Sequence, residues 1–295
     1  MMRFNAALAR RVALILGLSF PAFSNALADG RAVLPPKWMV EAYLSDALVK
    51  PSRDDIARAI IPGLGMMPAF MGPSVGPPPT FVNVGTEDNS APGLPSGWAA
   101  GDLHIIVALQ TSLSFPGTSI TAHSTPAGWT SLITPIVGTN GGGGGNVING
   151  GSKMQIFWRI AVGGDTAPNL SGGSGDYFVN YVLGYRGVLA SGPIEASAAT
   201  ALTATGASTF AYDAITTLGG SRTVLQIFGG GGGPASSSPD SGWTERVDRS
   251  EVVSRICMGI NEKTFAAAGV ISGGNITFAS APDVMTRVAL AILPA

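Results

Sequence analysis

Short apolar runs separated by turn residues fill the chain from about residue 80 to its end. In the run 103–110, apolar residues occupy both sets of alternating positions, which is typical of a strand buried on both faces. No helical period lies between the runs, so the pattern predicts an all-β domain over residues 80–295, an antiparallel β-sandwich or jelly roll of about 10–11 strands. We expect the strands at Thr80–Val84, Leu103–Gln110, Trp129–Val137, Met154–Ala161, Tyr177–Tyr185, Phe210–Thr216, Thr223–Phe228, Trp243–Val247, Ser254–Asn261, Asn275–Phe278 and Thr286–Leu293.

A weak internal repeat runs through this domain. Its shared kernel is a buried strand, a loop that ends in Gly-Trp-Thr, and two further strands. The two copies place Trp129 and Trp243 in equivalent positions and match Met154–Ile160 to Ser254–Ile260. We therefore expect two similar halves that form the two faces of one sandwich, with both tryptophans packed in the core.

Three segments precede the β domain. Residues 1–28 form a signal-like or apolar docking segment. Residues 29–62 are expected to form short helices, because apolar residues follow Trp38 at helical spacing and a capping box opens at Ser52. Residues 63–79 have the composition of a Pro/Gly/Met linker. The predicted assembly residues in these segments are Trp38, Tyr43, Met66, Met67, Phe70 and Met71.

The fate of the N-terminal segment separates two hypotheses. Residues 26–28 are Ala-Leu-Ala, the small residues that a signal peptidase accepts, and cleavage there would make the chain a secreted or surface protein. An uncleaved segment would instead dock on a neighbouring subunit. The apolar run 12–23 is shorter than the roughly 20 residues of a membrane span, and Pro21 interrupts it, so no stable membrane span is expected.

Composition and charge narrow the classes of partner. The 295 residues include 41 Gly and 21 Pro, and only 12% are charged, which favours short strands and turns with hydroxyl and amide groups at the surface. The net charge is −1 and no extended basic face is expected, so nucleic acid is not a predicted partner. The single cysteine, Cys257, cannot form an intrachain disulfide, and its alternating apolar neighbours indicate a buried packing role.

The sequence offers little for catalysis. His104 lies among core positions of a strand and His123 lies in a loop, neither beside a recognisable nucleophile. No charged residue occurs from Leu103 to Ser152, so the two carboxylates of a glycosidase are not expected there. The glycine runs Gly141–Gly145 and Gly229–Gly233 lack the Lys-Ser or Lys-Thr of a phosphate loop and are expected to be flexible or closely packed loops. We expect no enzyme, no cofactor and no metal site, although a paired-carboxylate cleft would revive an enzyme acting on polysaccharide.

Several short motifs occur in an order that resembles a known family. They are Trp98-Ala-Ala-Gly-Asp102-Leu-His-Ile-Ile-Val107, Pro126-Ala-Gly-Trp-Thr130, Gln155-Ile-Phe-Trp-Arg159, Gly184-Tyr-Arg-Gly-Val188 and Pro193-Ile-Glu-Ala-Ser197. Over about Pro95 to Pro294 this order resembles a glycine-rich β-sandwich structural protein of tailed phages and prophages, and is similar to modules in bacterial secreted surface proteins. The resemblance implies a virion role in the tail or its fibres. The signal-like N-terminus departs from that pattern.

The polar loops supply candidate ligand-binding residues, because hydroxyl and amide groups can hydrogen-bond sugars. These candidates are His123, Asn140, Asn146, Ser237, Asp240 and the loop at position 113, where Leu113 lies between the hydroxyl residues Ser112 and Ser114.

The resulting hypothesis is a non-enzymatic virion structural protein whose N-terminal segment serves assembly and whose β-sandwich serves packing or host-surface contact. Its partners would be other virion subunits, further copies of itself and a host surface glycan or receptor. The alternative is a secreted or surface-exposed bacterial adhesion or carbohydrate-binding module, released by cleavage after Ala28.

Overall fold

The computed structural model describes residues 76–112, 120–139, 151–203, 207–231, 236–251, 256–272, 274–282 and 284–295. The chain divides into two compact units after Ser74, and all described residues belong to the second unit. The predicted helices and the assembly residues from Trp38 to Met71 lie outside the described residues.

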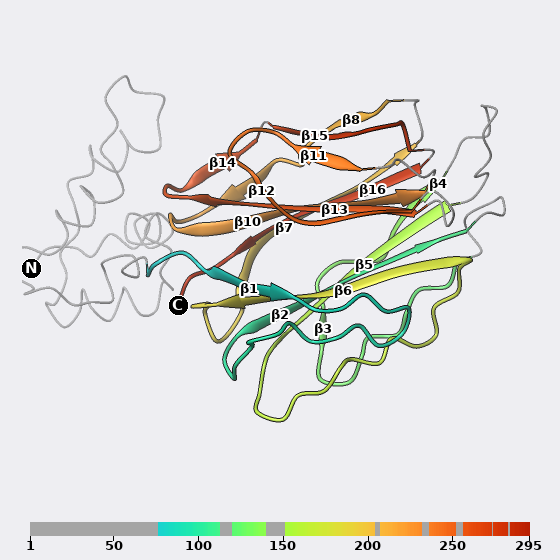
Figure 1. The fold of residues 1–295 in the computed structure, drawn as a ribbon. Helices are drawn as coiled ribbons and strands as arrows, with labels where there is room; N and C mark the ends of the chain where they lie inside the picture. Colours follow the sequence, from blue (N-terminus) through green and yellow to red (C-terminus); the bar gives the residue numbers. More distant parts are fainter. Residues whose placement is uncertain are drawn as a thin grey trace, which may run out of the picture. The chain divides into compact units, whose positions relative to one another are not determined.

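Two antiparallel sheets face each other in this unit (Figure 1). The first sheet has the order β1-β6-β2-β5-β3, with β4 also paired to β5. The second has the order β12-β13-β10-β16-β7. The first sheet is formed by β1 (Thr80–Val84), β2 (Leu103–Thr111), β3 (Thr130–Ser131), β4 (Ile136–Thr139), β5 (Gly151–Ile160) and β6 (Tyr177–Arg186). The second is formed by β7 (Ile194–Thr203), β10 (Arg222–Gly231), β12 (Thr244–Glu251), β13 (Ile256–Phe265) and β16 (Val284–Ile292).

Two smaller sheets belong to the same unit. A three-stranded sheet has the order β11-β15-β8, and it lies over the second large sheet in Figure 1. A two-stranded sheet pairs β14 with β9. These strands are β8 (Thr209–Ala211), β9 (Ile215–Thr217), β11 (Ser237–Pro239), β14 (Gly269–Ile271) and β15 (Asn275–Phe278).

Apolar side chains fill both faces of the large sheets. Between the sheets, alternate residues of β2 such as Val107 pack with residues of β10 such as Ile227 in one core. On the outer face of the first sheet, Phe157 lies in a second cluster beneath loop residues that include Trp129. On the outer face of the second sheet, Phe228 packs beneath residues of β15. This double coverage explains why the central strands carry buried apolar residues at both sets of alternating positions.

The all-β, antiparallel class predicted from the pattern is confirmed, since the described residues contain antiparallel strands and no helix. The structure has sixteen strands among the described residues, more than predicted, because β7, β11 and β14 were missed and two predicted strands are each split in two. The prediction that the run Gly229–Gly233 forms a loop is wrong for its first three residues. Gly229, Gly230 and Gly231 are buried residues of strand β10 and not loop residues, whereas Gly141–Gly145 lies outside the described residues.

The two large sheets share one pattern of pairing. Val107 of β2 lies opposite Ile156 and Tyr181, and Ile227 of β10 lies opposite Ile260 and Val288. Matching the two central strands in this way makes β6 equivalent to β16, β5 to β13, and β1 to β7, in the same sheet order. The order of the repeated elements thus agrees with the sequence repeat. The register differs, because the pairing matches Ile156 to Ile260, four residues from the match that the pattern suggested.

The tryptophans of the two Gly-Trp-Thr motifs occupy equivalent positions in this register. The guanidinium of Arg159 lies 5.6 Å from the ring centroid of Trp129. The amino group of Lys263 lies 5.9 Å from the ring centroid of Trp243. Arg159 and Lys263 are matched by the register of β5 and β13, so the two halves share a cation placed over the tryptophan that precedes the outer strand.

Cys257 is buried on β13, as predicted, and its thiol lies 3.7 Å from the carbonyl oxygen of Gly230. Burial raises the pKa of this thiol to about 12. The thiolate, which is the reactive form, is therefore scarce at neutral pH, and the residue fills space in the core.

Candidate functional site

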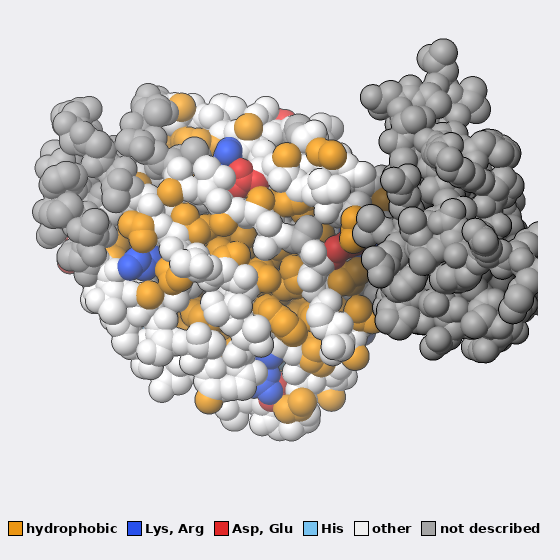
Figure 2. Space-filling model, turned by 180° about the vertical axis from the view of Figure 1, so that it is seen from behind, with side chains coloured by type: hydrophobic (Ala, Val, Ile, Leu, Met, Phe, Trp, Pro, Cys, Tyr) orange, Lys and Arg blue, Asp and Glu red, His pale blue; other side chains and the backbone are white. Residues whose placement is uncertain are grey.

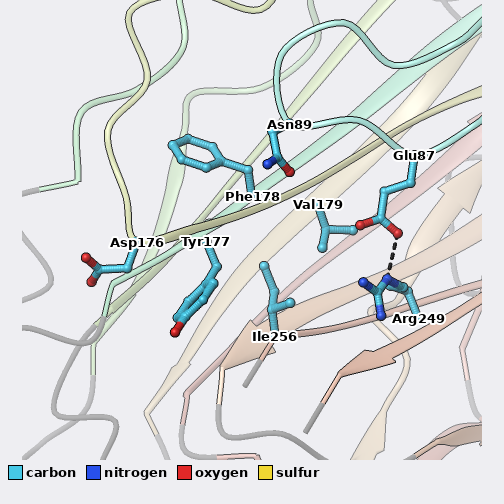
Figure 3. A pocket seen from close by; sticks show the side chains of 8 residues that line it. All are labelled: Glu87, Asn89, Asp176, Tyr177, Phe178, Val179, Arg249 and Ile256. Atoms are coloured by element: carbon cyan, nitrogen blue, oxygen red, sulfur yellow. Dashed lines mark hydrogen bonds and ion pairs between the residues drawn. The ribbon is translucent and has the colours of Figure 1, made fainter. Parts of the chain in front are cut away.

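A pocket of about 240 Å³ opens beside the first residues of β6, where this strand faces β13 of the second sheet (Figure 3). Its lining combines carboxylates, an amide, a guanidinium and an aromatic ring with aliphatic side chains. The lining residues are Glu87, Asn89, Asp176, Tyr177, Phe178, Val179, Arg249 and Ile256.

Strand alternation decides which of these side chains reach the core. Tyr177 and Val179 turn toward the space between the sheets and pack against the main core. Phe178 turns to the outer face, where its ring centroid lies 5.8 Å from that of His123. Ile256, at the start of β13, is also part of the core and lies among the labelled side chains in Figure 3. The pocket therefore has an aliphatic base and polar groups around it.

An ion pair occupies one end of the pocket. Arg249 Nε donates to Glu87 Oε2 at 2.6 Å, which links β12 of the second sheet to the loop that follows β1 of the first. Tyr181 donates its hydroxyl to the same carboxylate oxygen at 2.7 Å. Burial raises the pKa of Tyr181, and the hydrogen bond and charge of Glu87 raise it further, so this phenol stays protonated at physiological pH.

The other end of the pocket carries Asp176 and Tyr177, as Figure 3 shows. The hydroxyl of Ser112 donates to Asp176 Oδ2 at 3.1 Å, and the backbone N–H of Asp176 donates to the carbonyl of Thr111 at 2.9 Å. These bonds fix the turn that leads into β6. Among the lining residues that the structure describes there are two carboxylates and one guanidinium, a set that favours neutral or cationic groups over anions.

The predicted ligand-binding residues that the structure describes, His123, Ser237 and Asp240, do not line this pocket. His123 lies nearest, because it contacts Phe178, and its backbone N–H and C=O are both bonded to the side-chain amide of Gln155. Ser237 begins β11 and Asp240 directly follows that strand, over the outer face of the other sheet. Position 113, Asn140 and Asn146 lie outside the described residues.

Two carboxylates meet at Ser237. Its hydroxyl lies 3.2 Å from Glu245 Oε1 and 3.1 Å from Asp248 Oδ1. Burial raises the pKa of Glu245, and the charge of Asp248 raises it further. Asp240 is separate from this pair, since its Oδ2 accepts the backbone N–H of Asn275 at 2.7 Å. Both carboxylates of the pair are exposed on the edge strand β12, and within the described residues no group of three His, Cys, Asp or Glu side chains forms a metal site.

The motif residues of the sequence come together on the outer face of the first sheet. His104 is fully buried, with its ring 6.4 Å from that of Trp129 in a stacked arrangement and 5.4 Å from that of Trp98 in an edge arrangement. Arg186 binds the carboxylate of Asp102 through two bonds of 2.9 and 2.7 Å. This cluster fixes the covering loops to the sheet.

Both histidines of the chain have depressed pKa values. Burial lowers the pKa of His104, and the charges of Asp165 and Asp102 oppose that shift. Burial also lowers the pKa of His123, against a smaller opposing effect of the backbone of Ser171. Because an unfolded histidine titrates near 6.5, the unfolded state binds more protons than the folded state when the pH falls below about 7.

Acidification is therefore expected to destabilise the fold. The stabilisation is fully present above about pH 7 and is lost as the pH falls through 6.5 toward the lower folded pKa values, by at most about 1.4 kcal/mol per pH unit for each histidine. We expect a lower urea midpoint at pH 5 than at pH 7. Substituting both residues, as His104→Phe with His123→Phe, should reduce this difference. An equal loss in the parent and the double variant would contradict the assignment to these two rings.

The pocket residues escaped the sequence analysis because they are far apart in the chain. Asp176 lies in a turn-rich stretch. Glu87 and Arg249 lie in charged segments, Glu-Asp over 87–88 and Glu-Arg-Val-Asp-Arg-Ser-Glu over 245–251, which do not indicate which residues pair. One available signal was the sequence Asp176-Tyr177-Phe178, which places a carboxylate and two aromatic rings at the start of a strand.

Comparisons with known proteins do not extend this description: no family model, curated protein or solved structure matches the chain. In the part that the structure describes, no helix is long and apolar enough to cross a membrane.

Proposed function

We propose that this chain is a non-enzymatic structural subunit of a virion, at the tail, its fibres or another exposed position. Its N-terminal segment would serve assembly, and its β-sandwich would serve packing or host-surface contact. The order of motifs in the sequence supports the kind of particle, and the structure supplies an independent reason to favour a structural role.

The proposal rests on the ion pairs that the charged side chains form within the fold. Among the described residues all six arginines form ion pairs with carboxylates. Several of these pairs join covering loops or neighbouring strands, so the charged groups hold the fold together. The face shown in Figure 2 has hydrophobic side chains gathered across its centre with few charges among them. Such a surface suits packing against other subunits.

The alternative of a secreted adhesion or carbohydrate-binding module is favoured by one specific feature. Tyr177, Asn89 and Asp176 line the same pocket, and an aromatic ring beside amide and carboxylate groups suits a sugar ring with its hydroxyls. In this alternative the pocket would be the recognition site and the N-terminal 28 residues would be removed.

One experiment on the native protein separates the two. Particles and culture medium from cells that produce the chain are fractionated on a density gradient, and the chain is located by intact-mass and N-terminal analysis. We expect a chain that starts at Met1 or Met2 and sediments with particles. A chain that starts at Asp29 and is found in the medium or on the cell surface would overturn the virion proposal in favour of the adhesion module.

A further inference from the structure

The two halves of the β unit differ at one strand position. In the second sheet, β7 pairs along the whole of β16, from Thr203 opposite Val284 to Ile194 opposite Ile292. In the first sheet, the equivalent strand β1 pairs with β6 only between Leu183 and Arg186.

Both edge pairs contain an irregularity at the same place. In the first half it lies between Phe81 and Asn83, and in the second it lies between Ala291 and Ile292. The register that matches Tyr181 to Val288 also matches these two sites. The edge strands are therefore equivalent up to Val84, and they diverge after it.

After Val84 the chain of the first half no longer pairs as a strand beside β6. Gly85 still donates its N–H to the carbonyl of Val182 at 2.8 Å, but the chain then forms a loop whose Asp88 and Asn89 carbonyls accept the side-chain amide of Asn180. In this register Tyr177–Val179 corresponds to Val284–Thr286, which pairs with Ala201–Thr203 in the second half. Tyr177–Val179 has no such neighbour among the described strands, and these three residues line the pocket.

The main chain of β6 is oriented to accept a strand there. The carbonyls of Val182 and Asn180 point away from β2, since they accept the N–H groups of Gly85 and Asp88. Hydrogen-bonding direction alternates along a strand, so the N–H and C=O of Phe178, two residues further, point to the same open side. The pocket thus presents one backbone donor and one backbone acceptor at strand spacing.

We infer that this pocket is a strand-acceptor site. An extended segment of a neighbouring protein subunit, with small uncharged side chains, would pair antiparallel with Tyr177–Val179, as Ala201–Thr203 pairs with Val284–Thr286. The second half identifies the occupant, because the equivalent position there is filled by a strand whose sequence, Ala-Thr-Ala-Leu-Thr over 199–203, is uncharged and, apart from Leu202, made of small residues. The limited volume, about 240 Å³, also admits only small side chains. This inference rests on the proposed role in assembly.

The test uses a synthetic peptide with the sequence of residues 199–205 as the probe. The register places the residue equivalent to Thr203 directly opposite Tyr177. Directly opposed residues have Cβ atoms about 4.5–5.5 Å apart, close to the separation that a disulfide needs. The peptide cysteine is supplied as a mixed disulfide with 5-thio-2-nitrobenzoate, which leaves as the thiolate when the thiolate of a full-length Tyr177→Cys chain attacks. This exchange should be roughly tenfold faster with a peptide that carries the activated cysteine at the Thr203 position than with one that carries it at the Leu202 position, which points to the opposite face.

A control variant separates reaction at the pocket from random collision between the peptide and an exposed thiol. A Val270→Cys chain places the thiol at a residue that is 68% exposed and away from the pocket, and it should react equally with both peptides. The native Cys257 is buried and contributes no signal. Equal rates for the two peptides on the Tyr177→Cys chain, or no disulfide with either, would overturn the strand-acceptor site.

A second measurement needs no substitution. In the unaltered full chain, the amide of Phe178 should exchange with solvent more slowly in saturating peptide, whereas exposed loop amides should not change. Unchanged exchange at Phe178 would also overturn the inference. If the chain sediments with particles and the peptide fails both tests, only the acceptor site is lost. If the peptide binds and the chain is found secreted, the virion proposal fails and the site stands.

Discussion

Replacing Arg246 with methionine is expected to lower the free energy of unfolding by on the order of 3 kcal/mol, because it removes the counter-charge of a buried carboxylate. Glu262 accepts the hydroxyl of Tyr185 at 2.8 Å and forms an ion pair with Arg246. Tyr185 is fully buried, and burial together with the charge of Glu262 raises its pKa well above the usual value. The phenol therefore stays neutral and cannot balance the charge of Glu262 after Arg246 is replaced. The guanidinium also lies 4.3 Å from the ring centroid of Phe81, a packing contact that methionine keeps only in part.

The measurement is urea unfolding at pH 7, with Arg249→Met as the matched control. Arg249 has nearly the same exposure as Arg246, but its partner Glu87 is 26% exposed, compared with 11% for Glu262. Water can solvate Glu87 after the substitution, so this control should lose no more than about 1 kcal/mol. Adding Glu262→Gln to the Arg246→Met chain should recover part of its loss. Equal losses for the two single variants would show that burial of the carboxylate does not decide the effect.

The second large effect is expected from Gly230→Ala. An added Cβ would collide with the backbone carbonyl oxygen of Val284 on β16, and a paired strand cannot withdraw without losing its ladder. At the adjacent Gly229, the Cβ would meet the side-chain ends of Met154 at 2.6 Å and Leu109 at 2.9 Å, which can move. We expect a loss of roughly 3 kcal/mol for Gly230→Ala and about 1 kcal/mol for Gly229→Ala.

Gly229→Ala is the natural control for this comparison. Both substitutions reduce the backbone entropy of the unfolded chain equally, so their difference isolates the contact in the folded state. Thermal or urea unfolding of the two variants measures it. A Gly229→Ala chain that is as unstable as the Gly230→Ala chain would show that the whole core region is intolerant and that the contact with β16 is not the cause.

Strands rich in large aliphatic, β-branched and aromatic residues could be predicted from the sequence, and strands made of small residues could not. The predicted bounds of β1 match the structure, and those of β2 differ by one residue. The ten-residue strand β7 was missed because Ile194–Thr203 contains mostly Ala, Ser and Thr, which have little pattern of their own. Its conformation depends on pairing with β16, a strand about 90 residues further along the chain, as with Ala201 opposite Thr286.

The candidate site was harder to predict than the fold. The sequence drew attention to polar loops, whereas the pocket combines a loop, the first residues of one strand and residues of two strands from the other sheet. The ion pair of Glu87 with Arg249 joins residues 162 positions apart. A single sequence has no periodic signal for such a pair, because neither residue repeats or alternates with a partner.

By itself, the sequence determined the all-β class and antiparallel character of the described part of residues 80–295, and the order of two repeated sets of strands. These follow from local pattern, since alternation and turn residues act over a few positions. Only the tertiary structure decided the register of the halves, the placement of Gly229–Gly231 inside a strand, and the pocket beside Tyr177–Val179. Each of these depends on which distant strand lies alongside, and that is settled by packing across the two sheets rather than by neighbours in the chain.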